Sequence, residues 1–178
     1  FGCDSTRCGR FWIYGGMIMK LFPAVFLLFA AFIVPCKADV TGLPIPRFVS
    51  LRSNQINLRT GPGMRYPVEW VYMKSDLPVE ITAEFENWRR IKDWDGKEGW
   101  VHQHMLSGRR TIRLNKEALL LRAPAKGALP VAKAEAGVIG KLEMCPEHVD
   151  FCKADLQGFQ GWLPKEILWG VYPDEVYE

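Results

Sequence analysis

The segment Ile56-Asn57-Leu58-Arg59-Thr60-Gly61-Pro62-Gly63 begins the stretch of sequence that decides the fold, because the chain contains a second version of it. Residues 56–106 align with residues 119–168 at an offset of 62 or 63 positions. In this alignment Gly99-Trp100-Val101 returns as Gly161-Trp162-Leu163. Self-similarity at a long fixed period indicates repeated structural units. The sequence therefore predicts a tandem duplication.

Short runs of alternating apolar residues fill each copy. In the first copy such residues occupy every second position of two runs (Val68, Trp70 and Tyr72; Val79, Ile81 and Ala83). Strict alternation over a short run predicts a half-buried strand. Turn residues separate the runs, and Asp95-Gly96 is the strongest signal for a tight hairpin. We expect an all-β fold, with single helical turns only at residues 102–106 and 164–168.

The strands of each copy leave sheet edges that need protection. About five short strands in roughly 60 residues form a sheet with unpaired edges, and closure into a small barrel removes them. We therefore expect two small β-barrels in tandem, the first over residues 49–110 and the second over residues 111–172. Residues 39–48 are predicted to form an extended lead-in, and residues 173–178 a frayed tail.

An apolar run near the amino end predicts export. Met19-Lys20 precedes an uninterrupted apolar and proline stretch at residues 21–34, and the small residue Ala38 closes the segment. This pattern is typical of a secretory signal peptide, and the stretch is shorter than a membrane span. We expect residues 19–38 to be cleaved, with an uncleaved anchor as the alternative, and the mature protein to be periplasmic or secreted. Residues 1–18 are interpreted as upstream sequence outside the fold.

The leader carries the excess positive charge of the chain. Removing residues 1–38 lowers the formal net charge from +3 to zero, because five charged residues leave with it (Arg7, Arg10, Lys20, Lys37 and Asp4). A nucleic-acid-binding domain shows a clustered basic surface. We therefore expect no nucleic-acid partner.

Two cysteines remain after the leader, Cys145 and Cys152. They bracket the turn between two adjacent predicted strands, and paired cysteines of exported proteins normally close in an oxidising compartment. The sequence predicts a disulfide across this hairpin. Two thiolates without partner ligands make only half of a zinc site, so no metal is expected here.

Several motifs of the first copy, taken in order, carry a family resemblance. The glycine-rich segment at residues 56–63 is followed by Tyr66-Pro67-Val68, Trp88-Arg89-Arg90-Ile91 and Gly99-Trp100-Val101. This order closely resembles a bacterial SH3 (Src-homology-3) domain of the exported type, over nearly all of residues 49–110 and more loosely over 111–170. The resemblance implies two small SH3-like barrels in an exported protein, used as a cell-wall or peptide-binding module without catalysis of its own.

Catalytic groups are sparse in the predicted mature chain. His102, His104 and His148 are its histidines, and its thiols are expected to be oxidised. Nucleophilic catalysis needs a nucleophile beside an oriented base, and a metal at His102 and His104 would need a third ligand. Carboxylates such as Glu84 fall at predicted hairpin turns, where they are expected to be solvated. We therefore expect no catalytic residue, no metal and no cofactor.

The aromatic residues are better candidates for a binding site. Trp70 and Tyr72 align with Lys133 and Glu135, and a core position rarely accepts a charge. We expect both aromatics at the surface, either in a ligand groove or in the contact between the barrels. Trp94, whose counterpart is a leucine, joins this candidate ligand site.

Other recurring residues favour structural roles. Trp100 and Trp162 follow glycines at equivalent positions, which predicts core residues. Arg59 aligns with Arg122, and a recurring arginine before a loop is expected to hydrogen-bond the carbonyl groups of that loop, with carboxylate binding as the alternative. Arg59 and the nearby Tyr66 complete the candidate ligand-binding residues.

These observations predict a non-catalytic binding or adapter module of the cell envelope. Its expected partner is a cell-wall peptide, such as a peptidoglycan stem peptide, or an extended segment of an envelope protein. Two other classes stay open: a small cell-wall hydrolase or metal-dependent enzyme, and a purely structural subunit of an envelope complex.

Overall fold

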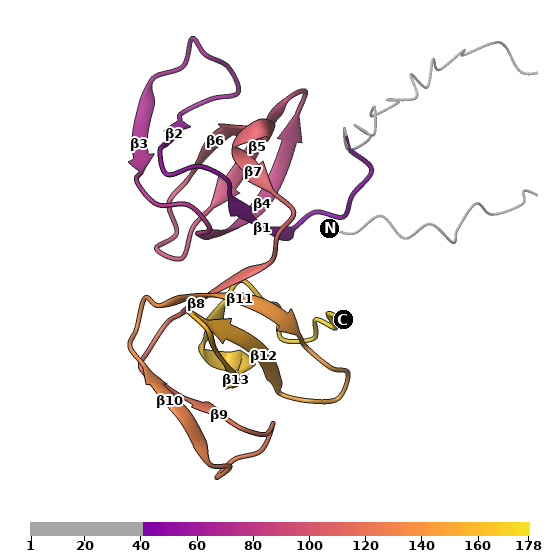
Figure 1. Ribbon diagram of the computed structural model, residues 1–178. Coiled ribbons are helices and arrows are strands. Elements are labelled where there is room, and N and C mark those ends of the chain that lie inside the picture. The colour runs from indigo at the N-terminus through magenta and orange to yellow at the C-terminus, as the bar shows by residue number, and fades with distance from the viewer. Residues whose placement is uncertain (1–40) are drawn as a thin grey trace, which may run out of the picture. The chain divides into compact units, whose positions relative to one another are not determined.

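The computed structural model describes residues 41–178, so the predicted leader and signal-peptide cleavage lie outside the described residues. Antiparallel strands form two seven-stranded sheets, which confirms the all-β prediction (Figure 1). The N-terminal sheet contains β1 (Arg47–Leu51), β2 (Ile56–Arg59), β3 (Val68–Tyr72), β4 (Pro78–Phe85), β5 (Trp88–Lys92), β6 (Glu98–His102) and β7 (Leu106–Ser107). The first strand thus begins within the predicted lead-in.

The C-terminal sheet has the same number of strands. It contains β8 (Thr111–Leu114), β9 (Ala118–Leu121), β10 (Pro130–Ala134), β11 (Ile139–Met144), β12 (Phe151–Leu156), β13 (Phe159–Pro164) and β14 (Leu168–Trp169). A single 3₁₀ turn precedes the last strand of each sheet, η1 (Gln103–Met105) and η2 (Lys165–Ile167). Both turns fall where the sequence predicts a helical turn.

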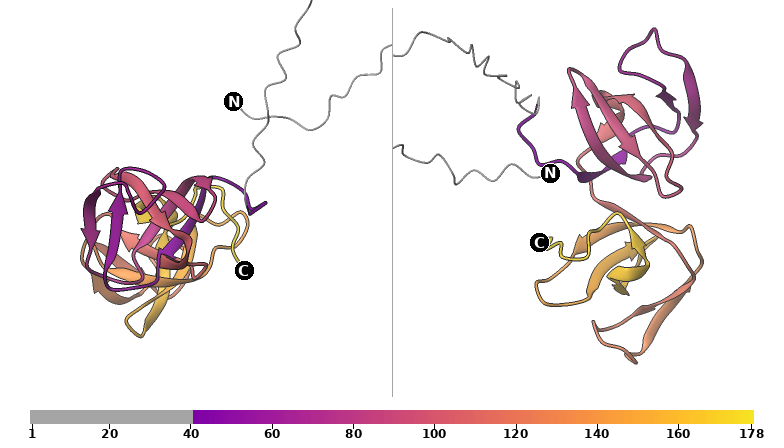
Figure 2. Two further views of the ribbon diagram at one scale, coloured as in Figure 1. Left: turned by 90° about the horizontal axis from the view of Figure 1, so that it is seen from above. Right: turned by 180° about the vertical axis from the view of Figure 1, so that it is seen from behind.

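The two sheets have the same strand order. The first runs β3-β2-β6-β5-β4-β1-β7, and adding seven to each number gives the second, β10-β9-β13-β12-β11-β8-β14. Figure 2 shows both sets of strands from two further sides. Closed barrels were expected, but within residues 41–178 no ladder joins β3 to β7 or β10 to β14. The last strand of each sheet has two residues and pairs only with β1 or β8, so both sheets stay open.

Each sheet has its own apolar core. The core of the N-terminal sheet consists of buried side chains contributed by alternate strand positions, chiefly Leu51, Ile56, Leu58, Val79, Ile81, Ile91 and Val101. The corresponding core of the C-terminal sheet contains Ile112, Leu114, Leu120, Leu142, Ala154 and Leu163 together with both cysteines. Burial of such side chains is the main stabilising contribution to a small β domain.

The structure corrects the alignment of the two copies by one residue in β2 and β3. Arg59 pairs with Trp100 in one sheet, and Leu121 pairs with Trp162 in the other. Arg59 is therefore equivalent to Leu121, rather than to Arg122. A shift of one residue in a strand exchanges its two faces. The surface assignment of Tyr72, which depended on the shifted alignment, fails for this reason.

Aromatic rings and hydrogen bonds connect the two sheets, which belong to one compact unit. Phe48 of β1 lies between Trp169 and Tyr172, with ring centroids 5.2 Å and 4.7 Å away. Trp169 donates its indole N–H to the Pro78 carbonyl at 3.0 Å, and the Tyr172 hydroxyl donates to Glu80 at 2.8 Å. Neither Trp70 nor Tyr72 takes part in these contacts, contrary to one of the two roles expected for them.

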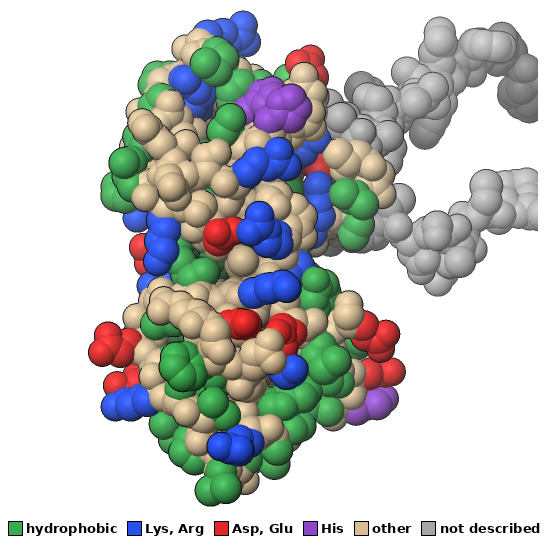
Figure 3. Space-filling view, viewed as in Figure 1, with side chains coloured by type: hydrophobic (Ala, Val, Ile, Leu, Met, Phe, Trp, Pro, Cys, Tyr) green, Lys and Arg blue, Asp and Glu red, His purple; other side chains and the backbone are tan. Residues whose placement is uncertain are grey.

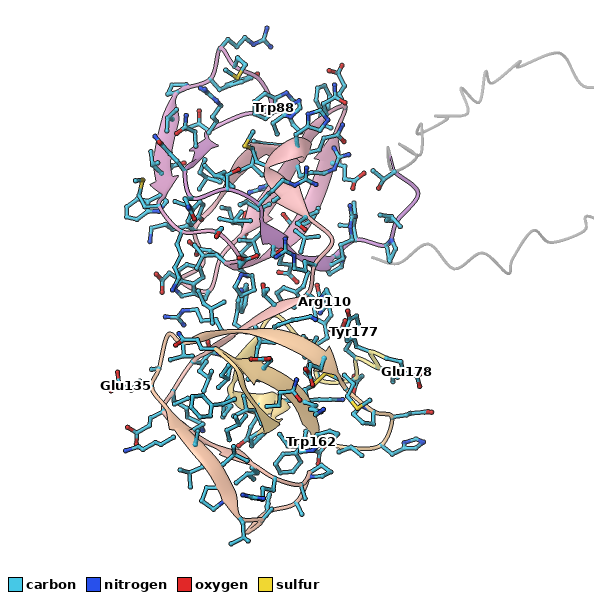
Figure 4. All side chains as sticks on the ribbon, viewed as in Figure 1. Trp88, Arg110, Glu135, Trp162, Tyr177 and Glu178 are labelled. Carbon is cyan, nitrogen blue, oxygen red and sulfur yellow. A yellow bond between two sulfur atoms is a disulfide. The ribbon has the colours of Figure 1, made fainter. Side chains whose placement is uncertain are left out.

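The carboxyl-terminal segment is held in place, although the sequence predicted a frayed tail. Tyr177 exchanges two main-chain hydrogen bonds with Cys145, at 2.6 Å and 3.0 Å. Arg110, in the link between the sheets, forms an ion pair with Glu175 and lies 5.4 Å from the centre of the Tyr177 ring (Figure 4). The prediction was wrong because these partners are distant in sequence and leave no local pattern.

The predicted disulfide between Cys145 and Cys152 is present and fully buried. It joins the end of β11 to β12 across their connecting loop. Of the residues that the structure describes, none belongs to a helix long and apolar enough to span a membrane.

The lead-in is fixed by a carboxylate that was expected to be solvated. Glu84 accepts hydrogen bonds from the Thr41 main chain and hydroxyl, and its side chain is only 1% exposed. Arg47 and Arg89 lie 2.5 Å and 3.2 Å from it. Burial alone would raise the pKa of Glu84, but the hydrogen bonds from Arg47 and Thr41 and the positive charge of Arg89 outweigh it and lower that pKa.

Candidate functional site

A groove of about 310 Å³ lies on the outer face of the N-terminal sheet. Strands β2, β5 and β6, the loop at residues 60–67 and the turn η1 surround it. Its lining residues are Gln55, Asn57, Arg59, Met64, Trp88, His102 and Met105. The combination of an aromatic ring, two thioethers and several amide or cationic groups suits a ligand with both apolar and hydrogen-bonding parts.

Strand register explains why these side chains share one face. Trp88 pairs with His102 across β5 and β6, and Arg90 pairs with Trp100. Trp100 pairs in turn with Arg59 of β2. Directly opposite residues of an antiparallel pair project to the same side of a sheet. Trp100 therefore lies on the outer face and is half-buried, as is its counterpart Trp162, although both were expected in a core.

Arg59 shapes the loop that borders the groove. Its guanidinium donates to the carbonyl groups of Tyr66 at 2.7 Å and Met64 at 3.3 Å. The Tyr66 ring packs against Gly61 so closely that a Cβ on this glycine would lie 2.5 Å from the ring. Both residues therefore fix the loop at residues 60–67, the structural role considered for Arg59 from its sequence position.

The floor of the groove is aromatic. Trp88 is 9% exposed, and the His102 ring meets it edge on with centroids 5.4 Å apart. The His104 ring in turn meets His102 edge on, with centroids 4.9 Å apart. Figure 3 shows the histidine surface on the N-terminal sheet, and Figure 4 labels Trp88. The residues that the structure describes contain no cluster of three or more potential metal ligands, here or elsewhere.

The structure separates Trp70 and Tyr72, which the sequence placed together on the surface. Trp70 is 46% exposed, and the Lys97 ammonium lies 4.6 Å from its ring centre. Tyr72 is buried, and its hydroxyl donates to Asp93 at 2.9 Å. The surface prediction for Tyr72 was wrong because its counterpart in the register of the sheets is the buried Ala134, rather than Glu135.

Trp94 faces the C-terminal sheet instead of the groove. The Arg113 guanidinium lies 4.8 Å above its ring, and Trp94 packs against the core of the N-terminal sheet. Its neighbour Asp93 is buried and accepts main-chain hydrogen bonds from Asp95 and Lys97, which fixes the β5–β6 turn. None of the predicted site residues except Arg59 lines the groove.

The corresponding face of the C-terminal sheet has different chemistry. Leu119 and Leu121 stand in place of Asn57 and Arg59, and Pro164 stands in place of His102. A cavity of about 400 Å³ nearby is lined by Phe151 and Pro164, among others, and reaches residues of the terminal segment. The polar groups of the groove thus belong to the N-terminal sheet alone.

Comparison with known proteins agrees with the sequence motifs of the first copy. Residues 52–108 match the family model of the bacterial SH3 domain. The match confirms the resemblance and covers β2 to β7 together with the whole groove. No curated protein matches the chain.

Two solved structures from Trichomonas vaginalis, those of NlpC2 and NlpC1, are also similar to the chain. Each is 12% identical with a TM-score of 0.32. The alignments cover 70% and 74% of this chain, and 48% of the matched chain in both cases. The chain therefore spans about half the length of these structures.

Most residues of the groove were not predicted from the sequence. Gln55 and Asn57 flank a buried strand residue, and polar residues beside such a strand carry no distinctive pattern. His102 was considered only as a metal ligand or a solvated turn residue. The available signal was the alternation of β6, which places His102 on the face of Trp100 rather than with the core residue Val101.

Proposed function

We propose that this protein is an exported, non-catalytic binding module of the bacterial cell envelope, and that its SH3 groove binds a short extended peptide. A peptidoglycan stem peptide is the first candidate, and an extended segment of an envelope protein is the second. The observation that carries the proposal is the groove itself, with Trp88 and His102 at its floor and free amide side chains at its rim.

The groove chemistry supports a peptide ligand. Trp88 offers an aromatic surface for apolar contacts, and Gln55 and Asn57 each offer an amide donor and an amide acceptor for a peptide main chain. Arg59 uses one guanidinium nitrogen on loop carbonyls and retains further N–H groups. These groups suit a ligand that carries a carboxylate.

Export also belongs to the proposal. The bacterial SH3 match and the buried disulfide favour an extracytoplasmic protein, since disulfides persist in oxidising compartments. We further propose that the common strand order of the two sheets arose by tandem duplication of one SH3-like unit, with the amide and imidazole groups of the groove present only in the first copy. A wall hydrolase and a purely structural subunit remain the competing functions.

The proposal is tested by titrating the protein with a soluble muropeptide. Isothermal calorimetry measures the affinity, and NMR of the main-chain amides identifies the residues involved. Binding should shift the signals of Asn57 and His102, and His102→Ala should weaken affinity by about fivefold or more. His148→Ala is the matched control, because this histidine is exposed in the loop between β11 and β12. Absence of binding to both muropeptide and purified sacculi would refute a cell-wall ligand, and release of soluble fragments from sacculi would favour the hydrolase.

A further inference from the structure

The edge strands β3 and β10 occupy the same position in their sheets and differ in composition. Strand β3 reads Val-Glu-Trp-Val-Tyr, and its first four residues are exposed. Val68 is 42%, Trp70 46% and Val71 37% exposed. Figure 1 shows β3 as the outermost strand of the N-terminal sheet. Within residues 41–178, no strand pairs with the outer side of β3, which therefore presents main-chain groups next to apolar side chains.

Strand β10 carries the features that protect an edge. Pro130 removes a main-chain donor, and Lys133 places an exposed charge on the strand, where it pairs with Glu117 at 2.9 Å. Proline and lysine on edge strands prevent pairing with other chains. Strand β3 has neither residue, and Val71 occupies the position equivalent to Lys133. The same fold thus blocks one edge and leaves the other open.

Basic side chains surround the open edge. Arg65 and Lys74 are exposed just before and just after β3, and Lys97 lies over the Trp70 ring while also pairing with Asp95 at 3.8 Å. Glu69 is the only acidic residue of the strand itself. An incoming strand with acidic side chains would gain favourable contacts with these cations.

We propose that β3 accepts an extended acidic segment of another protein as an added antiparallel strand. The edge N–H and C=O groups supply main-chain hydrogen bonds, and Val68, Trp70 and Val71 supply cross-strand contacts. No residue of β3 lines the SH3 groove, although Val71 and Val68 stand opposite the groove residues Asn57 and Arg59 across the β2–β3 ladder. The inference therefore does not rest on the proposed function.

A second copy of the chain fits this edge less well than an acidic segment. Two β3 strands related by a two-fold axis at Trp70 would bring Lys74 of one copy opposite Tyr66 of the other, beside Arg65. Like charges would then meet at both ends of the shared ladder, and such neighbours are destabilising. The charges around β3 thus favour a partner of opposite charge.

The test uses two synthetic peptides with the full chain: one of alternating valine and glutamate, and one in which lysine replaces glutamate. Calorimetry measures affinity, and hydrogen exchange measures protection of the amides at residues 68–72. Val71→Lys introduces the residue that β10 already carries at the same position, so the fold should tolerate it. Val131→Lys is the matched control, since Val131 lies on β10 and is also 37% exposed.

The acidic peptide should bind, protect the β3 amides, and lose about fivefold or more in affinity with Val71→Lys but not with Val131→Lys. Equal binding of both peptides, or an unchanged affinity in Val71→Lys, would overturn the proposal. If the protein without peptide dimerises, and Val71→Lys abolishes the dimer, the partner of β3 would be a second copy of the chain and not an acidic segment. Muropeptide added to the peptide complex should still shift the signals of His102, which separates this surface from the groove.

Discussion

Trp169 donates its indole Nε1–H to the main-chain carbonyl of Pro78, 3.0 Å away in the other sheet. The same ring meets Phe48 edge on at 5.2 Å, which is a favourable aromatic geometry. One side chain therefore contributes a hydrogen bond and an aromatic contact to the junction of the sheets. We expect this junction to make the two sheets unfold together.

Trp169→Ala should lower the free energy of unfolding by about 2 kcal/mol or more, because it removes a large apolar side chain and leaves the Pro78 carbonyl without this donor. Urea denaturation followed by circular dichroism measures the change. Phe159→Ala is the control, since Phe159 is 56% exposed and should cost less than about 0.5 kcal/mol. If Trp169→Ala unfolded at the same urea concentration as the unaltered protein, the junction would contribute little to the free energy of unfolding.

Alkaline pH should destabilise the protein through Tyr72 and Tyr172. The pKa of both tyrosines is raised above the ordinary value of 10.0. For Tyr72 the main cause is burial, followed by the hydrogen bond to Asp93. For Tyr172 the main cause is burial, followed by the hydrogen bond to Glu80. A raised pKa in the folded state contributes stability that is present below pH 10 and is lost as pH rises above it. Guanidinium denaturation at several pH values between 8 and 11 should show the free energy of unfolding falling with pH. Tyr172→Phe should make that fall less steep. If the free energy of unfolding of Tyr172→Phe fell with pH as steeply as that of the unaltered protein, Tyr172 would not be a source of the alkaline destabilisation.

Gly61→Ala should disturb the groove, because its Cβ would lie 2.5 Å from the Tyr66 ring. We expect a loss of about 1 to 2 kcal/mol in stability and weaker muropeptide binding, as the loop at residues 60–67 moves. Gly63→Ala is the matched control, since its Cβ would meet the same ring at an ordinary 3.4 Å. Thermal melts and calorimetry compare the two variants, and equal effects would exclude close packing at Gly61 as the cause.

Removal of the disulfide by the double substitution Cys145→Ala and Cys152→Ala should cost about 2 to 3 kcal/mol, as expected for a short closed loop. For a domain of this size the melting temperature should fall by roughly 5 to 10 °C. Amide exchange at Tyr177 should also accelerate, because its main chain pairs with Cys145. Calorimetric melts of the oxidised protein and of this variant decide the point, and equal melting temperatures would refute the stabilising role.

Local sequence patterns were sufficient for much of the fold. Alternation in the run at Val79, Ile81 and Ala83 predicted a strand, and Asp95-Gly96 predicted the turn between β5 and β6. The spacing of Cys145 and Cys152 predicted a disulfide that the structure contains. These features depend on neighbours within a few residues, so the sequence alone specifies them.

The candidate site could not be predicted in the same way, because it depends on register. Aligning Leu58 with Leu121 instead of Leu120 exchanged the faces of β2 and β3, and Tyr72 was then assigned to the surface. In the structure Gly99 packs against Leu58, and Gly161 packs against Leu120, which defines the true match. Such contacts between distant strands fix the register and have no local sequence signal.

The ion pair of Arg110 and Glu175 and the pairing of Tyr177 with Cys145 connect the link between the sheets to the end of the chain. Because Phe48 of one sheet packs against Trp169 of the other, a cut at Gly108 would uncover Phe48 on one product and Trp169 on the other. Gene rearrangements that moved one sheet alone would yield a protein with an exposed aromatic surface. The pair of sheets is the smallest portion of this chain that we expect evolution to transfer intact to another protein.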